Sequence, residues 1–131
     1  MSEPVTVRKG DAVDYDLQND SLFSYARGLK YRTSVDVDGI ILDIAEDNSL
    51  MSVEILYVSG RFGITRQDVR QSIVSRKLGL DVKLEVSENL INVTLDLKIL
   101  KRNVEVERVA CASAMNSMNL PTGSGSLAMI T

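Results

Sequence analysis

The chain has 131 residues, a net charge of −3, 44% hydrophobic and 25% charged residues, one cysteine and no histidine. That length and balance are typical of one folded domain and argue against wholesale disorder. The lack of histidine excludes Ser-His-Asp and Cys-His catalytic systems and the usual zinc sites, and a single cysteine excludes iron–sulfur sites within one chain. Enzyme chemistry would have to use carboxylates, Lys, Tyr or a bound metal.

We expect neither a transmembrane helix nor a signal peptide. No apolar run reaches bilayer-spanning length, and the N-terminus "MSEPVTVRKGD" has no apolar core of the kind that signal peptides need. We therefore expect a cytoplasmic protein with no membrane partner. Cys111 lies in "VACASAM" with no histidine to activate it, so a small buried side chain is favoured over a reactive thiol.

The first half of the chain predicts short antiparallel strands. The alternating segments 13–17, 21–27, 33–37, 39–45 and 49–58 are separated by "QND", by Asp38-Gly39 and by residues 46–49, which are rich in turn formers. The last of these segments aligns its apolar side chains on one face only if a bulge occurs near Met51 and Ser52. Five strands joined by tight turns are therefore expected over residues 11–60.

One helix is expected over residues 65–78. Thr65 can cap it with Asp68 three residues later, and Gly79 would stop it. An apolar stripe at helical spacing predicts the face that packs on the sheet; it contains Val69, Ile73, Val74 and Leu78.

Three further strands follow with a period of two, over 82–86, 91–99 and 104–106, joined by "SEN" and "KRN". The tail from Val109 has no charged side chain, which argues against a solvated terminus. We expect the strand that begins at Val104 to continue through Ala110 and Ala112. The segment "SLAMI" (126–130) would then return as a final strand on an open edge of its own sheet or of a second copy.

These elements predict an α+β fold, mainly an antiparallel β meander of about eight strands in one curved sheet or open barrel, with one helix at an end. A single domain over 1–131 is expected. This domain would comprise the β hairpins at 11–60, the helix with the second β meander at 61–112, and an uncharged C-terminal tail at 113–131.

Three sets of charged residues are candidate sites. Asp36, Asp38, Asp43 and Asp47 could supply oxygen ligands to a divalent metal, but the EF-hand spacing fails because Ile40, Ile41 or Ala45 falls where a ligand or glycine is required. Hairpin turns explain these acids better.

Asp14, Asp16 and Asp20 could supply a catalytic carboxylate pair, although aspartates beside a turn are common. Arg66, Arg70 and Lys77 could contact RNA phosphates, but the net negative charge favours a solvated face. No catalytic residue and no cofactor is predicted.

Two stretches carry a family resemblance. "DYDLQNDSLFSYA" (14–26) and "DGIILDIAEDNSLMSVEILYVS" (38–59) resemble domain of unknown function 2283, a family of small bacterial and archaeal proteins. The resemblance implies a small antiparallel sheet, no established activity, and a role as an accessory partner of other small proteins. The matching positions are Tyr15, Asp16, Asp20, Leu22, Phe23, Gly39, Ile40, Leu42, Asp43, Glu54, Ile55, Leu56 and Ser59.

The expected function is non-catalytic binding of another protein, including a second copy of the chain. The alternative is a small-molecule or metal-binding enzyme that uses carboxylates. A third possibility is weak association with RNA through the helix.

Overall fold

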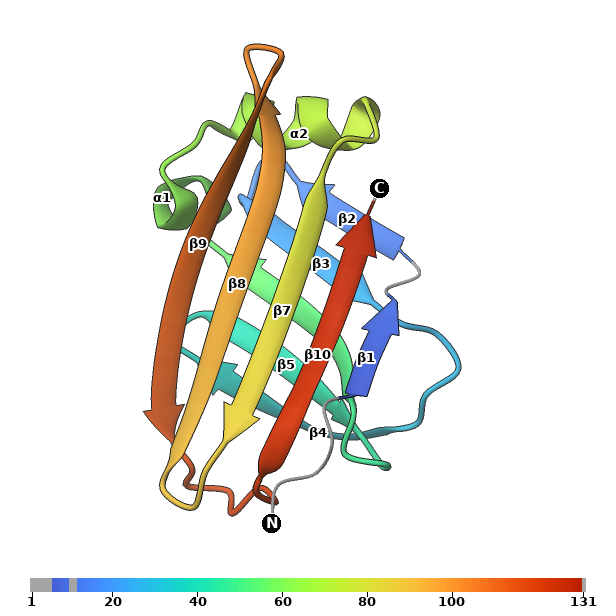
Figure 1. Cartoon of the computed structure of the whole chain (residues 1–131), viewed down its shortest axis with the longest axis vertical. Coiled ribbons are helices and arrows are strands. Elements are labelled where there is room, and N and C mark those ends of the chain that lie inside the picture. The colour runs from blue at the N-terminus through green and yellow to red at the C-terminus, as the bar shows by residue number, and fades with distance from the viewer. Residues whose placement is uncertain (1–5, 10–11, 131) are drawn as a thin grey trace.

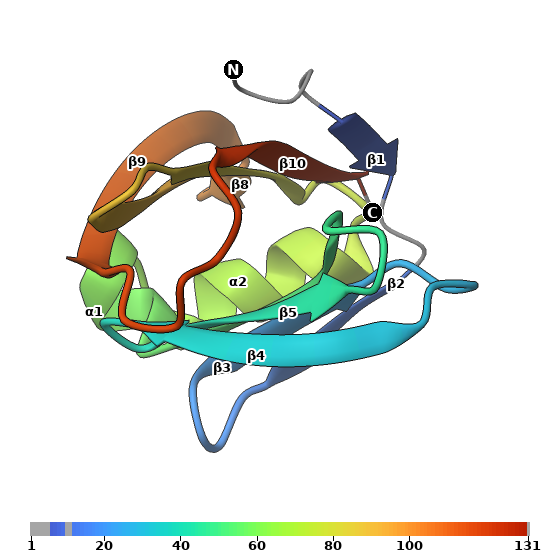
Figure 2. The same ribbon diagram turned by 90° about the horizontal axis from the view of Figure 1, so that it is seen from below.

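The computed structural model of the chain describes residues 6–9 and 12–130, which form ten strands and two helices in two stacked layers (Figure 1, Figure 2). One layer, here called the hairpin sheet, contains β2 (Ala12–Asp16), β3 (Ser21–Tyr25), β4 (Tyr31–Val37), β5 (Ile40–Ala45) and β6 (Leu50–Leu56), in the order β2-β3-β6-β5-β4. The other, the meander sheet, contains β1 (Thr6–Lys9), β7 (Gly79–Val86), β8 (Leu90–Lys101), β9 (Val104–Met115) and β10 (Gly123–Ile130), in the order β1-β10-β7-β8-β9.

The mainly antiparallel α+β class expected from the sequence is confirmed. The strands divide into two sheets rather than one curved sheet, and one pair, β1 with β10, is parallel. For all strands except β1, the division falls at α1 (Val58–Phe62) and α2 (Arg66–Val74), which lie between β6 and β7 in the chain. Because each group of strands has one apolar face, stacking the two faces removes both from water.

The core lies between the sheets and follows the period of two. Alternate side chains of β5 and β6 are buried on one side, and alternate side chains of β7 and β8 on the other. α2 lies at one end of the sandwich (Figure 1). There the hydroxyl of Ser72 donates to the carbonyl oxygen of Leu100 and accepts from its N–H at 2.9 Å, so the helix is bonded to the end of β8.

The hairpin turns agree with the sequence prediction. Asp38 and Gly39 both have positive φ, 51° and 84°, as a two-residue primed turn requires, and Asn48 has φ 67° in the next turn. The bulge expected near Met51 is confirmed: Asp43 is paired with Ser52 and Ile44 with Leu50, which leaves Met51 without a partner on β5.

α2 has the predicted cap but is shorter than predicted. Thr65 and Asp68 form a reciprocal capping box, and Val69 is fully buried as expected. The helix ends at Val74, because the left-handed Arg76 (φ 56°) turns the chain out of the helix before Leu78. Val74 is therefore 69% exposed, so placing it on the packed stripe was wrong. Gly79 begins β7 instead of ending the helix.

The tail forms a strand, as expected. β10 pairs antiparallel with β7 of its own sheet along its whole length, and it lies between β7 and β1 rather than at an open edge. Within residues 6–9 and 12–130, neither helix has the length and apolar character needed to cross a bilayer.

Candidate functional site

Asp20 is the centre of a buried polar network in the segment that carries the family resemblance. The residue is only 3% exposed. Its carboxylate accepts hydrogen bonds from the Tyr15 hydroxyl at 2.6 Å, and from the Ser59 hydroxyl at 2.6 Å and N–H at 3.1 Å. The Nε atom of Arg66 lies 3.9 Å away. Burial, followed by the bond to Asp20, raises the pKa of Tyr15, so its hydroxyl remains a donor. These contacts join the β2–β3 hairpin to the starts of both helices.

The neighbouring aspartates do not join Asp20 in a shared catalytic pair. Asp16 accepts hydrogen bonds from the N–H groups of Gln18 and Asn19 and from the side-chain amide of Asn19. The bonds from Asn19 lower the pKa of Asp16, which identifies this carboxylate as a turn-forming group. Asp14 is paired with Phe23 in the ladder and is exposed. The three carboxylates thus lie in three different environments.

The four aspartates considered as metal ligands are also distributed over several local contacts. Asp36 accepts from the N–H of Gly39, Asp43 accepts from the hydroxyls of Ser34 and Ser52, and Asp47 accepts from Ser49. Asp38 is exposed in the β4–β5 turn. Over the part of the chain that the structure describes, no group of three or more His, Cys, Asp or Glu residues is arranged to hold a metal ion.

The basic residues considered for RNA do not form one face of α2. Arg66 donates to the carbonyl oxygens of Leu17 and Gln18 at 3.1 and 2.9 Å, so it contacts the β2–β3 turn. Arg70 is exposed on the helix, and Lys77 is exposed beyond its end.

One edge of β9 is unpaired among the described strands of the meander sheet. β9 is paired with β8 over twelve residues, and no described strand pairs with its other edge. The other edge strands, β1, β2 and β4, have four, five and seven residues. Since natural proteins usually shorten, bend or cover an edge strand, the length of β9 stands out.

The side chains of β9 also fit an interaction edge. On the outer face Val109 is 59% exposed and Met115 is 79% exposed. Cys111 is exposed as well, so the burial expected from the sequence was wrong. On the inner face Ala110 and Ala112 are small and only partly buried against the core. Because this half of the strand has no charge, the sequence predicted that the strand continues past Val109 but gave no sign that it stays unpaired.

Comparisons with known proteins agree with the motif found in the hairpin sheet. The family model described as "Protein of unknown function (DUF2283)" matches residues 12–59. A protein of Methanosarcina mazei named "Putative hypoxanthine phosphoribosyltransferase" is 44% identical over 108 residues, which are 82% of this chain and 84% of that protein. An uncharacterized protein of Methanocaldococcus jannaschii is 26% identical over 111 residues, 85% and 92% of the two chains. No solved structure matches the chain.

Proposed function

The chain belongs to the DUF2283 family of proteins of unknown function, and from that premise we propose that it is a non-catalytic interaction module. Its partner is a second copy of the same chain, and the contact is antiparallel pairing of β9 with β9. The observation that carries this proposal is the twelve-residue β9, which is unpaired along one edge among the described strands. A second strand at that edge would satisfy its unpaired N–H and C=O groups.

The charge pattern of β9 favours a copy of itself in antiparallel orientation. The first half of the strand carries Glu105, Glu107 and Arg108, and the second half carries no charge. A two-fold axis at Cys111 places Glu107 opposite Met115. Every charged residue in the overlap then faces an uncharged one, whereas parallel pairing in register would oppose glutamate to glutamate.

The position of α1 favours the same register. α1 lies beside the first half of β9, toward the end of the sandwich that holds α2 (Figure 1). With the two-fold axis at Cys111, only residues 107–115 pair with the second copy. Val104 and its neighbours, which lie beside α1, stay outside the contact. The continuous sheet would extend across both copies, with the two-fold axis perpendicular to it.

The first test measures the oligomeric state by sedimentation velocity over a range of concentrations. We expect a concentration-dependent dimer that Val109→Lys dissociates, because two introduced ammonium groups would lie near the axis. Val74→Lys is the matched control, since Val74 is 69% exposed on α2 and should leave the dimer intact. A monomer at all concentrations, or equal effects of the two variants, would refute the proposal.

The second test determines the register through the single cysteine. With the axis at Cys111, the two Cys111 residues are directly opposite, where Cα atoms of antiparallel strands are about 4.5–5.5 Å apart, within the range for a disulfide. Mild oxidation should therefore produce a covalent dimer that reductant reverses, and Val109→Lys should suppress it. A dimer in solution that gives no Cys111 cross-link would contradict this register.

A second candidate function comes from the name of the Methanosarcina relative, which suggests transfer of a phosphoribosyl group to hypoxanthine. The 44% identity over most of both chains is the observation that favours it. The assay incubates purified protein with hypoxanthine and a phosphoribosyl donor and measures nucleotide formation by chromatography. If monomeric Val109→Lys still forms the nucleotide, catalysis requires only one chain and does not use the β9 edge.

A further inference from the structure

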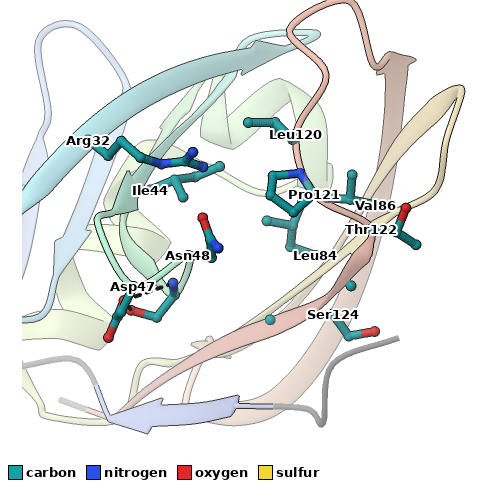
Figure 3. Close-up of a pocket in the computed structure, with 13 residues that line it drawn as sticks. Arg32, Ile44, Asp47, Asn48, Leu84, Val86, Leu120, Pro121, Thr122 and Ser124 are labelled. Atoms are coloured by element: carbon teal, nitrogen blue, oxygen red, sulfur yellow. Dashed lines mark hydrogen bonds between the residues drawn. The ribbon is translucent and has the colours of Figure 1, made fainter. Parts of the chain in front are cut away.

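A cavity of about 300 Å³ is lined by residues of both sheets (Figure 3). Its β7 residues, Leu84 and Val86, lie at the end of that strand farther from α2 (Figure 1). Its floor is apolar and consists of the buried side chains of Ile44, Leu84, Val86 and Leu120. The volume is at the lower end of the range found for small-molecule sites in proteins. The position of the cavity is also typical of ligand sites, because loops from both sheets come together at the end of a β-sandwich.

Arg32 reaches the cavity because of a β-bulge. On β4, Tyr31 is paired with Ala45 and Thr33 with Ile44, so Arg32 has no partner residue on β5. In regular alternation Arg32 would share the outer face with Ser34. The extra residue instead puts Tyr31 there, where its hydroxyl lies 2.7 Å from the Ser34 hydroxyl. Bulges of this kind re-aim a side chain and are common beside binding sites.

The polar side chains at the cavity differ in whether they already have hydrogen-bond partners. Among the described residues, the Arg32 guanidinium makes no hydrogen bond or ion pair. In Figure 3 it lies on the same side of the cavity as the amide of Asn48, with Leu84 and Pro121 on the opposite side. The Asp47 carboxylate accepts from the N–H and hydroxyl of Ser49 and is turned away from the cavity (Figure 3). The cavity lining therefore offers a ligand the Arg32 cation beside the Asn48 amide.

We propose that this cavity binds a small organic anion. Its carboxylate or phosphate pairs with Arg32, because a guanidinium presents a planar fork of donors to such oxygens. Its apolar body packs on Leu84, Val86 and Leu120, and the Asn48 amide supplies a further donor or acceptor. The site is separate from β9 and does not depend on self-association.

The test is an NMR titration of the full chain with three probes of similar size: benzoate, phenyl phosphate and neutral benzyl alcohol. We expect at least one anion to shift the amide resonances of residues 46–49, 120 and 122–125 in a saturable way. Benzyl alcohol should bind at least about tenfold more weakly, the loss expected for a charge-assisted hydrogen bond. Preference between benzoate and phenyl phosphate identifies the acid group.

Two variants locate the anion contact. Arg32→Gln should weaken binding of the preferred anion at least about tenfold, while Arg70→Gln, which removes an exposed arginine on α2 at the other end, should not change it. Both positions are exposed, so an unchanged melting temperature checks that each variant folds. The proposal fails if neither anion gives saturable shifts at these residues, if benzyl alcohol binds equally well, or if Arg32→Gln binds like the parent.

Discussion

Single side chains in the family segment mainly build the fold. Asp20 joins a hairpin to the start of α1, and Asp43 joins β4 to β6 through the hydroxyls of Ser34 and Ser52. Gly39 has φ 84°, and a Cβ atom there would come within 2.8 Å of the Arg61 side chain, which donates to the carbonyl oxygen of Asp38. Since these residues have structural partners, the motif by itself points to no reaction.

The Asp20 network predicts a large effect of a small substitution. Asp20→Asn keeps the shape of the side chain but places an NH₂ group among donors, so it should lower the free energy of unfolding by about 2–4 kcal/mol. Denaturant unfolding measures this change. Asp14→Asn is the control, because Asp14 is exposed, and it should cost less than about 0.5 kcal/mol. Equal effects would mean that the network does not stabilise the hairpin.

Asp16 predicts a pH dependence. Its hydrogen bonds, first from Asn19 and then from Gln18, lower its pKa in the folded state. A lowered carboxyl pKa stabilises the fold above the unfolded pKa, and this stabilisation disappears as the pH falls through the folded value. The stability difference between the parent and Asp16→Ala should therefore shrink as unfolding is measured from neutral to strongly acidic pH. A difference that grows on acidification would reverse the assigned sign.

Among the helices and strands, the sequence predicts those whose pattern is local. The period of two located nearly every long strand, and Thr65 with Asp68 located the start of α2. The end of α2 was missed because Arg76 adopts a left-handed conformation, which an arginine in the sequence does not predict. α1 was missed for the same reason, since it follows Tyr57 at φ 62°. The bulge that aims Arg32 at the cavity depends on pairing with β5, so the sequence of β4 alone could not predict it.

Two valines of α2 test the assignment of its faces. Val69→Ala should lower the free energy of unfolding by about 1.5–3 kcal/mol, because the fully buried side chain leaves a cavity behind. Val74→Ala removes the same atoms from a residue that is 69% exposed, so it should cost less than about 0.5 kcal/mol. Both values come from denaturant unfolding. The reverse order would place the other face of the helix against β8.

At the scale of the whole molecule, the two ends of the described chain meet. β1 pairs with β10 in parallel, with Thr6 opposite Gly125, and the next strand in the chain, β2, belongs to the other sheet. This contact spans nearly the entire sequence, so no local pattern could predict it. It also means that β10 is an interior strand of the meander sheet, and that the tail helps to connect the two layers.

The position of β10 predicts that the tail is required for folding. Deleting residues 116–131 would remove the strand between β7 and β1 and uncover the core beside Leu127, which is fully buried. We expect the truncated protein to lose its cooperative thermal transition. Leu127→Ala tests the same contact with the tail present and should cost about 2–5 kcal/mol, while Met118→Ala, at a residue 51% exposed, should cost less than about 0.5 kcal/mol. A truncated chain that melts cooperatively at the parent temperature would show that the remaining strands form a complete core, and β10 would then be an added strand.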